Sequence, residues 1–125
     1  MIRRSVLLAL VLVLAVIVAA SAFGRGTATR SQALVGTVGP GYTINLTVGG
    51  KKVVRLKAGT YKLTINDKAS IHAWSLDGPN GYAKDFTKVP FVGTKTFTVK
   101  LVAGKYKYYC PPHEPTMFGH FTVVA

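Results

Sequence analysis

A short segment near the C-terminus holds three side chains that could bind one metal ion. Cys110 is followed by His113 three positions later and by Met117 four positions after that. Cys110 is the only cysteine of the chain, so it has no disulfide partner within the molecule. Thiolate, imidazole and a weakly bound thioether are three of the four ligands of a blue-copper site, which also needs a second histidine. We therefore interpret the segment as a metal site.

The second histidine has to come from another part of the chain, which offers His72 and His120. His120 alternates with Phe121 and Val123 in the closing segment, so a buried Phe/Val face would leave His120 in solvent. We therefore predict that His72 is the remaining ligand. The alternative for His72 is a histidine that is simply hydrogen-bonded within a strand.

The donor types favour copper. Thiolate and imidazole select copper or zinc, and a thioether adds a preference for copper. A structural zinc site usually has four strong ligands, commonly paired cysteines, which a single cysteine cannot provide. Pro111, Pro112 and Pro115 restrict the backbone around His113, so the ligands can move little when an electron is gained or lost. These features indicate one copper ion that carries electrons.

The sequence offers little for catalysis, and we expect no enzyme. It has four acidic residues in all, no His-x-His pairs for a multicopper cluster, and no nucleophile elbow, P-loop or dinucleotide-binding glycine pattern. Glu114 is the one carboxylate able to approach the metal, and we interpret it as a solvated loop residue.

The N-terminus has the length and order of an export signal, which we assign to residues 1–22. A basic start is followed by an apolar run from Val6 to Ala20 and by the small residues Ala20-Ser21-Ala22. We expect cleavage there, while an uncleaved run could attach the protein to a membrane through residues 5–23. The protein is thus expected to be exported, to the periplasm, the extracellular space or the outer face of the cytoplasmic membrane.

Residues 23–33 are small, polar and basic, and are predicted to be a flexible tether before one domain over 34–125. That domain shows the two-residue period of β-strands almost throughout, with Gly, Asn and Pro between the runs. About seven to eight short strands predict an all-β antiparallel sandwich or barrel. The expected strands are 42–48, 53–56, 61–65, 70–76, 94–101, 105–109 and 119–124.

Alternation also sets the direction of the side chains around Cys110. Tyr106, Tyr108 and Cys110 share one face, which we expect to point into the sandwich. The opposite face carries Lys105, Lys107 and Tyr109. We interpret it as a solvated surface, with a docking and electron-exit surface as the alternative.

The formal net charge of +12 comes from lysines and arginines that form no block. Nucleic-acid binding is therefore not expected. A dispersed basic surface can be simply solvated, or it can steer the protein towards an acidic partner or an anionic membrane face. Charge alone does not choose between these roles.

The block from Gly104 to Val123 resembles the copper loop of plastocyanin-like cupredoxins. Ser70-Ile71-His72, followed by a Gly-Pro turn, resembles the segment that carries their first histidine. The similarity covers about residues 34–125. It implies a Greek-key β-sandwich and a small exported electron carrier that serves a redox partner protein. It also implies one type 1 copper ion bound by His72, Cys110, His113 and Met117.

Two features depart from the family pattern. Three residues separate His113 from Met117, and Ala73 stands where the family often has an asparagine that braces the ligand loops. Trp74 could shield the metal from water, and a place in the core explains it equally well. We expect a monomer. The alternatives to electron carriage are a protein that stores or delivers copper without redox cycling, and a metal-free accessory module of the same fold.

Overall fold

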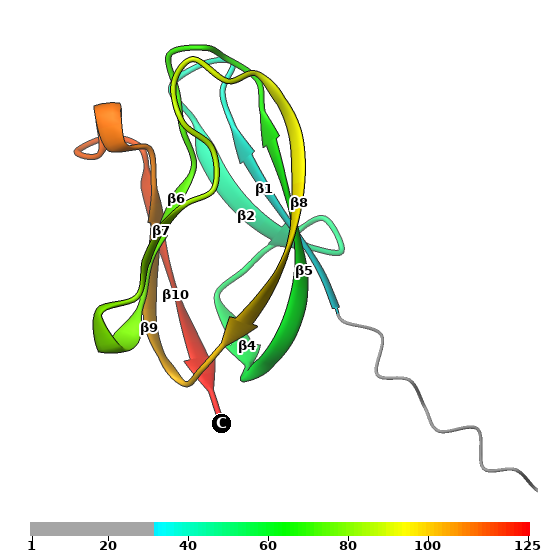
Figure 1. Cartoon of the computed structure of the whole chain (residues 1–125). Coiled ribbons are helices and arrows are strands. Elements are labelled where there is room, and N and C mark those ends of the chain that lie inside the picture. The colour runs from blue at the N-terminus through cyan, green and yellow to red at the C-terminus, as the bar shows by residue number, and fades with distance from the viewer. Residues whose placement is uncertain (1–31) are drawn as a thin grey trace, which may run out of the picture.

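The computed structural model describes residues 32–125, which form two β-sheets packed face to face (Figure 1). One sheet has the strand order β3-β2-β1-β5-β8, and the other has the order β4-β10-β9-β6-β7. The predicted all-β sandwich is confirmed. The predicted export signal and nearly all of the predicted tether lie outside the described residues. Within residues 32–125, no helix is long and apolar enough to cross a membrane.

The strands of the first sheet are β1 (Gln32–Val38), β2 (Ile44–Val48), β3 (Lys51–Lys52), β5 (Gly59–Asp67) and β8 (Gly93–Leu101). Those of the second sheet are β4 (Arg55–Lys57), β6 (Ser75–Asp77), β7 (Ala83–Asp85), β9 (Gly104–Tyr109) and β10 (Phe118–Val124). Two short 3-10 helices, η1 (Pro79–Gly81) and η2 (Pro111–His113), interrupt the connections.

The strand pattern predicted purely antiparallel pairing, and this is wrong for two pairs of strands. β1 runs parallel to β5, and β4 runs parallel to β10. Parallel neighbours need a crossover connection, which alternation along a single strand does not reveal. The strand β7 was also missed, because it lies within the stretch 77–90 that reads as an irregular connection.

His72 does not lie on a strand, which corrects the prediction for residues 70–76. Only Ser75–Asp77 of this region is strand; Ser70 and Ile71 form a turn, and residues 72–74 have no regular structure. The side-chain Oδ1 of Asp67 accepts a hydrogen bond from the Ala69 N–H at 3.3 Å, and the Ala69 carbonyl accepts one from the His72 N–H at 3.2 Å. An aspartate that bonds the backbone two residues on favours a turn over a strand. Consequently His72 and Trp74 do not share a strand face.

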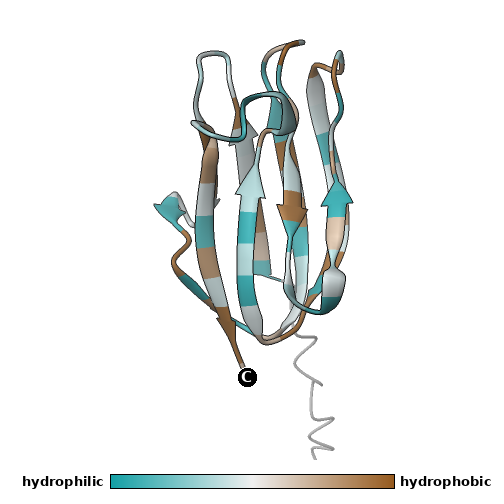
Figure 2. Ribbon diagram, turned by 90° about the vertical axis from the view of Figure 1, so that its left-hand side faces the viewer, coloured by the Kyte–Doolittle hydropathy of each residue, from teal (hydrophilic) through white to brown (hydrophobic). Residues whose placement is uncertain are grey.

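Alternating burial builds the core. Tyr61, Leu63, Ile65 and Asp67 of β5 point inward, while Lys62 is exposed. Figure 2 shows the same alternation of apolar and polar bands along the strands. At the centre, Trp74 stacks on Tyr108 with ring centroids 5.7 Å apart and ring planes only 5° from parallel. This aromatic pair joins the segment after His72 to the strand before Cys110.

The strands bring both predicted metal-binding segments to one end of the sandwich. β5 ends at Asp67 and β9 ends at Tyr109, next to the start of β10 at Phe118. The first described residue, Gln32, pairs with Tyr61 at the opposite end, and the C-terminus lies at that end as well (Figure 1). The chain therefore enters and leaves the domain far from the metal-binding segments.

Gly36 of β1 lies directly under the core aromatics, and its substitution tests this packing. A Cβ at position 36 would lie 2.6 Å from Ile65 Cδ1 and 2.8 Å from Trp74 Cε2. We expect Gly36→Ala to lower the free energy of unfolding by about 1–3 kcal/mol, because the core has to shift to make room. Chemical denaturation measures this change.

Gly41→Ala is the matched control, because a Cβ at Gly41 meets no atom within 4 Å. It should change the free energy of unfolding by less than about 0.5 kcal/mol. Equal stabilities for the two variants would contradict the packing described here.

Candidate metal centre

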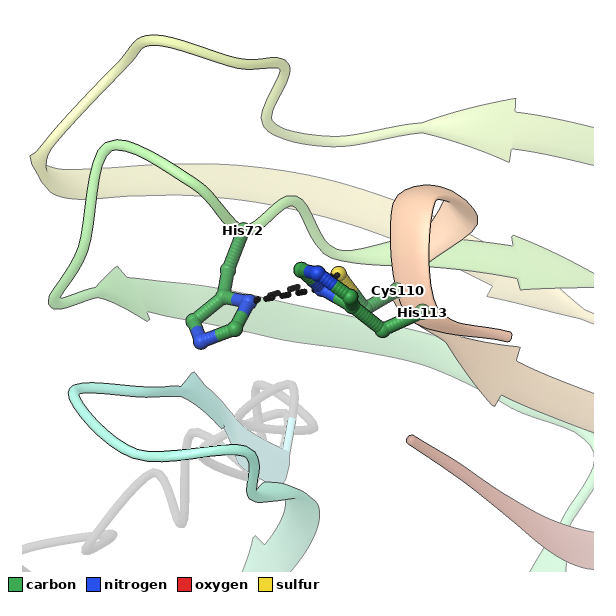
Figure 3. Close-up of side chains that lie close together, drawn as sticks. All are labelled: His72, Cys110 and His113. Atoms are coloured by element: carbon green, nitrogen blue, oxygen red, sulfur yellow. Dashed lines mark hydrogen bonds between the residues drawn. The ribbon is translucent and has the colours of Figure 1, made fainter. Parts of the chain in front are cut away.

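Three of the four predicted ligands converge at the end of the sandwich (Figure 3). The Cys110 Sγ lies 3.7 Å from Nδ1 of His72 and 3.6 Å from Nδ1 of His113. The two Nδ1 atoms lie 3.1 Å apart. Each residue therefore presents its donor atom to the same point, although His72 is 38 residues from Cys110 in the sequence.

The spacing of these donor atoms fits a single transition-metal ion. Zn²⁺, for comparison, bonds imidazole nitrogen at about 2.0–2.1 Å and thiolate sulfur at about 2.3 Å. Donors separated by 3.1–3.7 Å can all reach those distances from one ion placed between them. Two imidazoles and one thiolate are soft and intermediate donors, which suits copper.

The loop between β9 and β10 is folded back on itself by its own backbone. The His113 N–H donates to the Cys110 carbonyl at 3.0 Å, and the Met117 N–H donates to the His113 carbonyl at 2.9 Å. The Cys110 N–H in turn donates to the Met117 carbonyl at 3.0 Å. The start and the end of the loop are thereby locked together, and this places Met117 beside Cys110.

Met117 is buried in the core cluster, with 1% of its surface exposed. Its position in the closed loop and its burial would suit a weak fourth ligand. Together with His72, Cys110 and His113 it completes the two-histidine, cysteine and methionine set of a type 1 copper site. That the methionine sulfur binds the metal stays a prediction.

The backbone N–H of Ala73 supports the cysteine sulfur. It lies 3.4 Å from Cys110 Sγ, within reach of a hydrogen bond to sulfur. Burial raises the pKa of the Cys110 thiol, and the carboxylate of Asp67 raises it further, whereas the backbone N–H groups of Ala73 and His113 lower it. The metal-free thiol is therefore held in its protonated form until a metal displaces the proton.

The centre is largely buried, and His113 is its most exposed histidine. His72 and Cys110 are fully buried, whereas His113 is partly exposed. Tyr42, on the loop between β1 and β2, contacts both imidazoles edge-on, with ring centroids 5.3 Å from His72 and 5.0 Å from His113. The tyrosine itself is 64% exposed. The edge of His113 and the ring of Tyr42 thus separate the metal centre from solvent.

Other residues considered from the sequence lie outside the centre. His120 is exposed on β10, as expected from alternation. Glu114 is exposed and forms an ion pair with Lys107 at 2.8 Å. Trp74 lies in the core, where it stacks on Tyr108 and its Nε1–H donates to the Asn45 carbonyl at 3.2 Å.

Sequence reasoning missed Tyr42 and Asp67. Tyr42 was read as part of a strand, and the Gly39-Pro40-Gly41 sequence before it was the signal for a loop instead. Asp67 follows the apolar run of β5 in the inward-facing register, where a carboxylate is unusual.

Neither a protein-family model nor a curated protein sequence matches the chain. Solved structures do match it. Rusticyanin from Thiobacillus ferrooxidans is 25% identical, with a TM-score of 0.52 over 74% of this chain and 76% of that one. A histidine-to-methionine variant of rusticyanin is 26% identical with a TM-score of 0.53 over the same shares.

A reduced tryptophan-to-tyrosine mutant of amicyanin is 18% identical, with a TM-score of 0.50 over 74% of this chain and 83% of that one. At this identity the match supports the fold alone. One of the rusticyanin structures is described as that of a copper protein. The matches to rusticyanin at 25–26% identity confirm the fold that the sequence resemblance implied.

The buried state of Cys110 predicts a protected thiol in the metal-free protein. At pH 8, we expect a disulfide reagent to react at least about tenfold more slowly with the folded protein than with the unfolded chain. The reasons are the lack of access and the raised thiol pKa. Stopped-flow measurement with and without denaturant gives both rates, and equal rates would show that the thiol is not enclosed as described.

Proposed function

We propose that this chain, a cupredoxin with the donor set of a type 1 copper site, carries single electrons. The observation that carries the proposal is the convergence of His72, Cys110 and His113 within one small, largely buried space. Met117 is proposed as the weak fourth ligand. When bound, copper supplies the one-electron chemistry of the Cu(I)/Cu(II) couple. The side chains around it set how easily an electron enters and leaves.

The ligand loop is suited to fast exchange because it is rigid. Its two backbone hydrogen bonds at Met117 and the prolines of η2 restrict the positions of Cys110 and His113. The Ala73 N–H links the sulfur to the segment that carries His72. Ligands that are already close together need little movement between oxidation states, so little free energy is spent on reorganisation.

The geometry also favours electron carriage over storage or delivery of copper. His72 and Cys110 are fully buried, so an ion bound there could leave only if the ligand loop opened. An electron, in contrast, can pass through the partly exposed imidazole of His113 without any opening. We propose that a redox partner docks over His113 and Tyr42.

We further propose that the protein is exported, as the sequence of residues 1–22 suggests. The seven residues of β1 span about 20 Å at roughly 3.3 Å per residue, and they run from the tether towards the metal end. Whether or not the leader is cleaved, the tether therefore joins the domain at the end remote from the metal. An anchored form would keep the metal end free to meet a partner.

An acidic partner is proposed from the charge balance. The formal net charge is +12. Each of the four acidic side chains is either buried or bonded to another side chain. Asp67 is buried, Asp77 accepts from the Tyr109 hydroxyl, Asp85 accepts from Ser75, and Glu114 pairs with Lys107. Lys88 is exposed near the metal centre, beside a hollow of about 210 Å³ that Ala73, Pro111 and Pro112 also line. Unpaired positive charge near the site would attract an acidic surface.

Adding Cu(II) to the purified domain tests the metal site. We expect one copper per chain and an intense blue colour from thiolate-to-copper charge transfer, with a reversible one-electron wave in voltammetry. Cys110→Ser should abolish the colour, and His72→Ala should abolish or strongly shift it, because each removes a ligand.

His120→Ala is the matched control for the histidine variant, since His120 is exposed and away from the centre. It should keep the colour and the wave. A colourless wild type would favour the metal-free accessory module, and a blue protein that no mild oxidant or reductant can cycle would favour copper storage.

Electron exchange with small ions tests the proposed charge steering. The rate with hexacyanoferrate, an anion, should fall as salt rises, because salt screens the attraction. Lys88→Glu should lower this rate by roughly two- to tenfold at low salt. Lys100 pairs with Thr60 at the end of the sandwich remote from the metal centre. Lys100→Glu makes the same charge change there and should lower the rate less. Equal effects of both variants would contradict steering at the metal end.

A further inference from the structure

Two buried polar atoms lack a hydrogen-bond partner among residues 32–125. They are Oδ2 of Asp67 and Nε2 of His72. Asp67 is 2% exposed and His72 is 0% exposed. Buried polar groups without partners are rare, because the hydrogen bonds lost to water are not replaced. The two atoms are also complementary, since a carboxylate accepts a hydrogen bond and a protonated imidazole nitrogen donates one.

Both side chains belong to one corner of the fold. Asp67 and His72 flank the turn at Ala69, whose N–H bonds Asp67 Oδ1 and whose carbonyl accepts from the His72 N–H. Val38, which pairs with Asp67 in the sheet, directly precedes Gly39. A Cβ at Gly39 would lie 3.1 Å from His72 Cδ2 and 3.2 Å from the Ala69 Cβ. Because Cδ2 is bonded to Nε2, the unpaired edge of the imidazole lies at this same corner.

Metal binding determines which nitrogen of His72 carries the proton. Nδ1 faces Cys110 and His113, so the metal would take Nδ1 and the proton would reside on Nε2. A metal-bound histidine almost always donates this second proton to a carboxylate or a carbonyl, which fixes the ring orientation. Within the described residues, Asp67 Oδ2 is the one buried side-chain oxygen that lacks a donor.

We propose that Asp67 is a positioning residue of the metal centre and accepts the Nε2 proton of His72, directly or through one buried water. The inference rests on the proposed function, because it requires a metal bound to Nδ1 of His72. It assigns two effects to Asp67. The hydrogen bond holds the ring of His72 with Nδ1 towards Cys110. The negative charge near the metal stabilises Cu(II) relative to Cu(I), because the oxidised centre carries one more positive charge.

The first test uses the zinc-loaded protein, which is diamagnetic and does not depend on redox cycling. With ¹⁵N-labelled histidine, NMR should show His72 protonated on Nε2, with its proton at the low field of a strong hydrogen bond. In Asp67→Val, exchange of this proton with water should be at least about tenfold faster. A wild-type His72 protonated on Nδ1, or an Nε2 proton without a hydrogen-bond shift, would overturn the proposal even if no variant folded.

The second test compares reduction potentials of the copper-loaded protein. Asp67→Asn keeps the shape and an acceptor oxygen but removes the charge, so the potential should rise. Asp77→Asn makes the same charge change at the end of β6, where the Asp77 carboxylate accepts a hydrogen bond from the Tyr109 hydroxyl. Its effect should be clearly smaller.

Equal reduction potentials for the two variants would overturn the electrostatic role of Asp67. A purely structural role would lower the stability of Asp67→Asn without raising its potential above that of Asp77→Asn. Loss of copper cycling in the wild type, with the zinc spectrum as expected, would contradict the electron-carrier proposal and leave the role of Asp67 intact.

Discussion

The arrangement depends on the sulfur of Cys110 being fixed between two separate segments of the chain. Within its own loop, backbone hydrogen bonds from Cys110 to His113 and Met117 fix the residue that carries the sulfur. From the other segment it is approached by the Ala73 N–H at 3.4 Å and by Nδ1 of His72 at 3.7 Å. If these segments were not in register, the donor atoms would not share one point, and no soft metal site would exist.

The core of the sandwich holds these two segments in register. Trp74 lies two residues after His72, and Tyr108 lies two residues before Cys110, so their stacking fixes the two segments against each other just below the metal centre. Gly36 makes room for the indole from the facing sheet. Packing of the core and geometry of the site are therefore coupled. A substitution that shifts the aromatic pair would be felt at the donor atoms, because close-packed interiors transmit such shifts.

Much of the site could be predicted from residue types and spacing, and less of the fold. Cys110, His113 and Met117 lie within eight residues, so they cannot be far apart in space. The chain has only two other histidines, and because alternation places His120 in solvent, His72 remained as the second histidine ligand. The turn that carries His72 was not predicted, because the capping of Ala69 by Asp67 overrides the alternation of residues 70–76. The parallel pairing of β1 with β5 was missed as well, since a crossover leaves no periodic signal. Asp67 stayed unnoticed because the expected strand ended at residue 65, although the alternation continues and places Asp67 on the inward face.

Copper K-edge X-ray absorption of the oxidised and reduced protein tests the central claim most directly. Two nitrogen ligands and one thiolate sulfur are expected to bind the copper. The bond lengths to these ligands are expected to change little on reduction, because the loop fixes the ligands. A shell of nitrogen and oxygen without a short sulfur bond, or a change in the number of ligands on reduction, would contradict a preformed site built on Cys110.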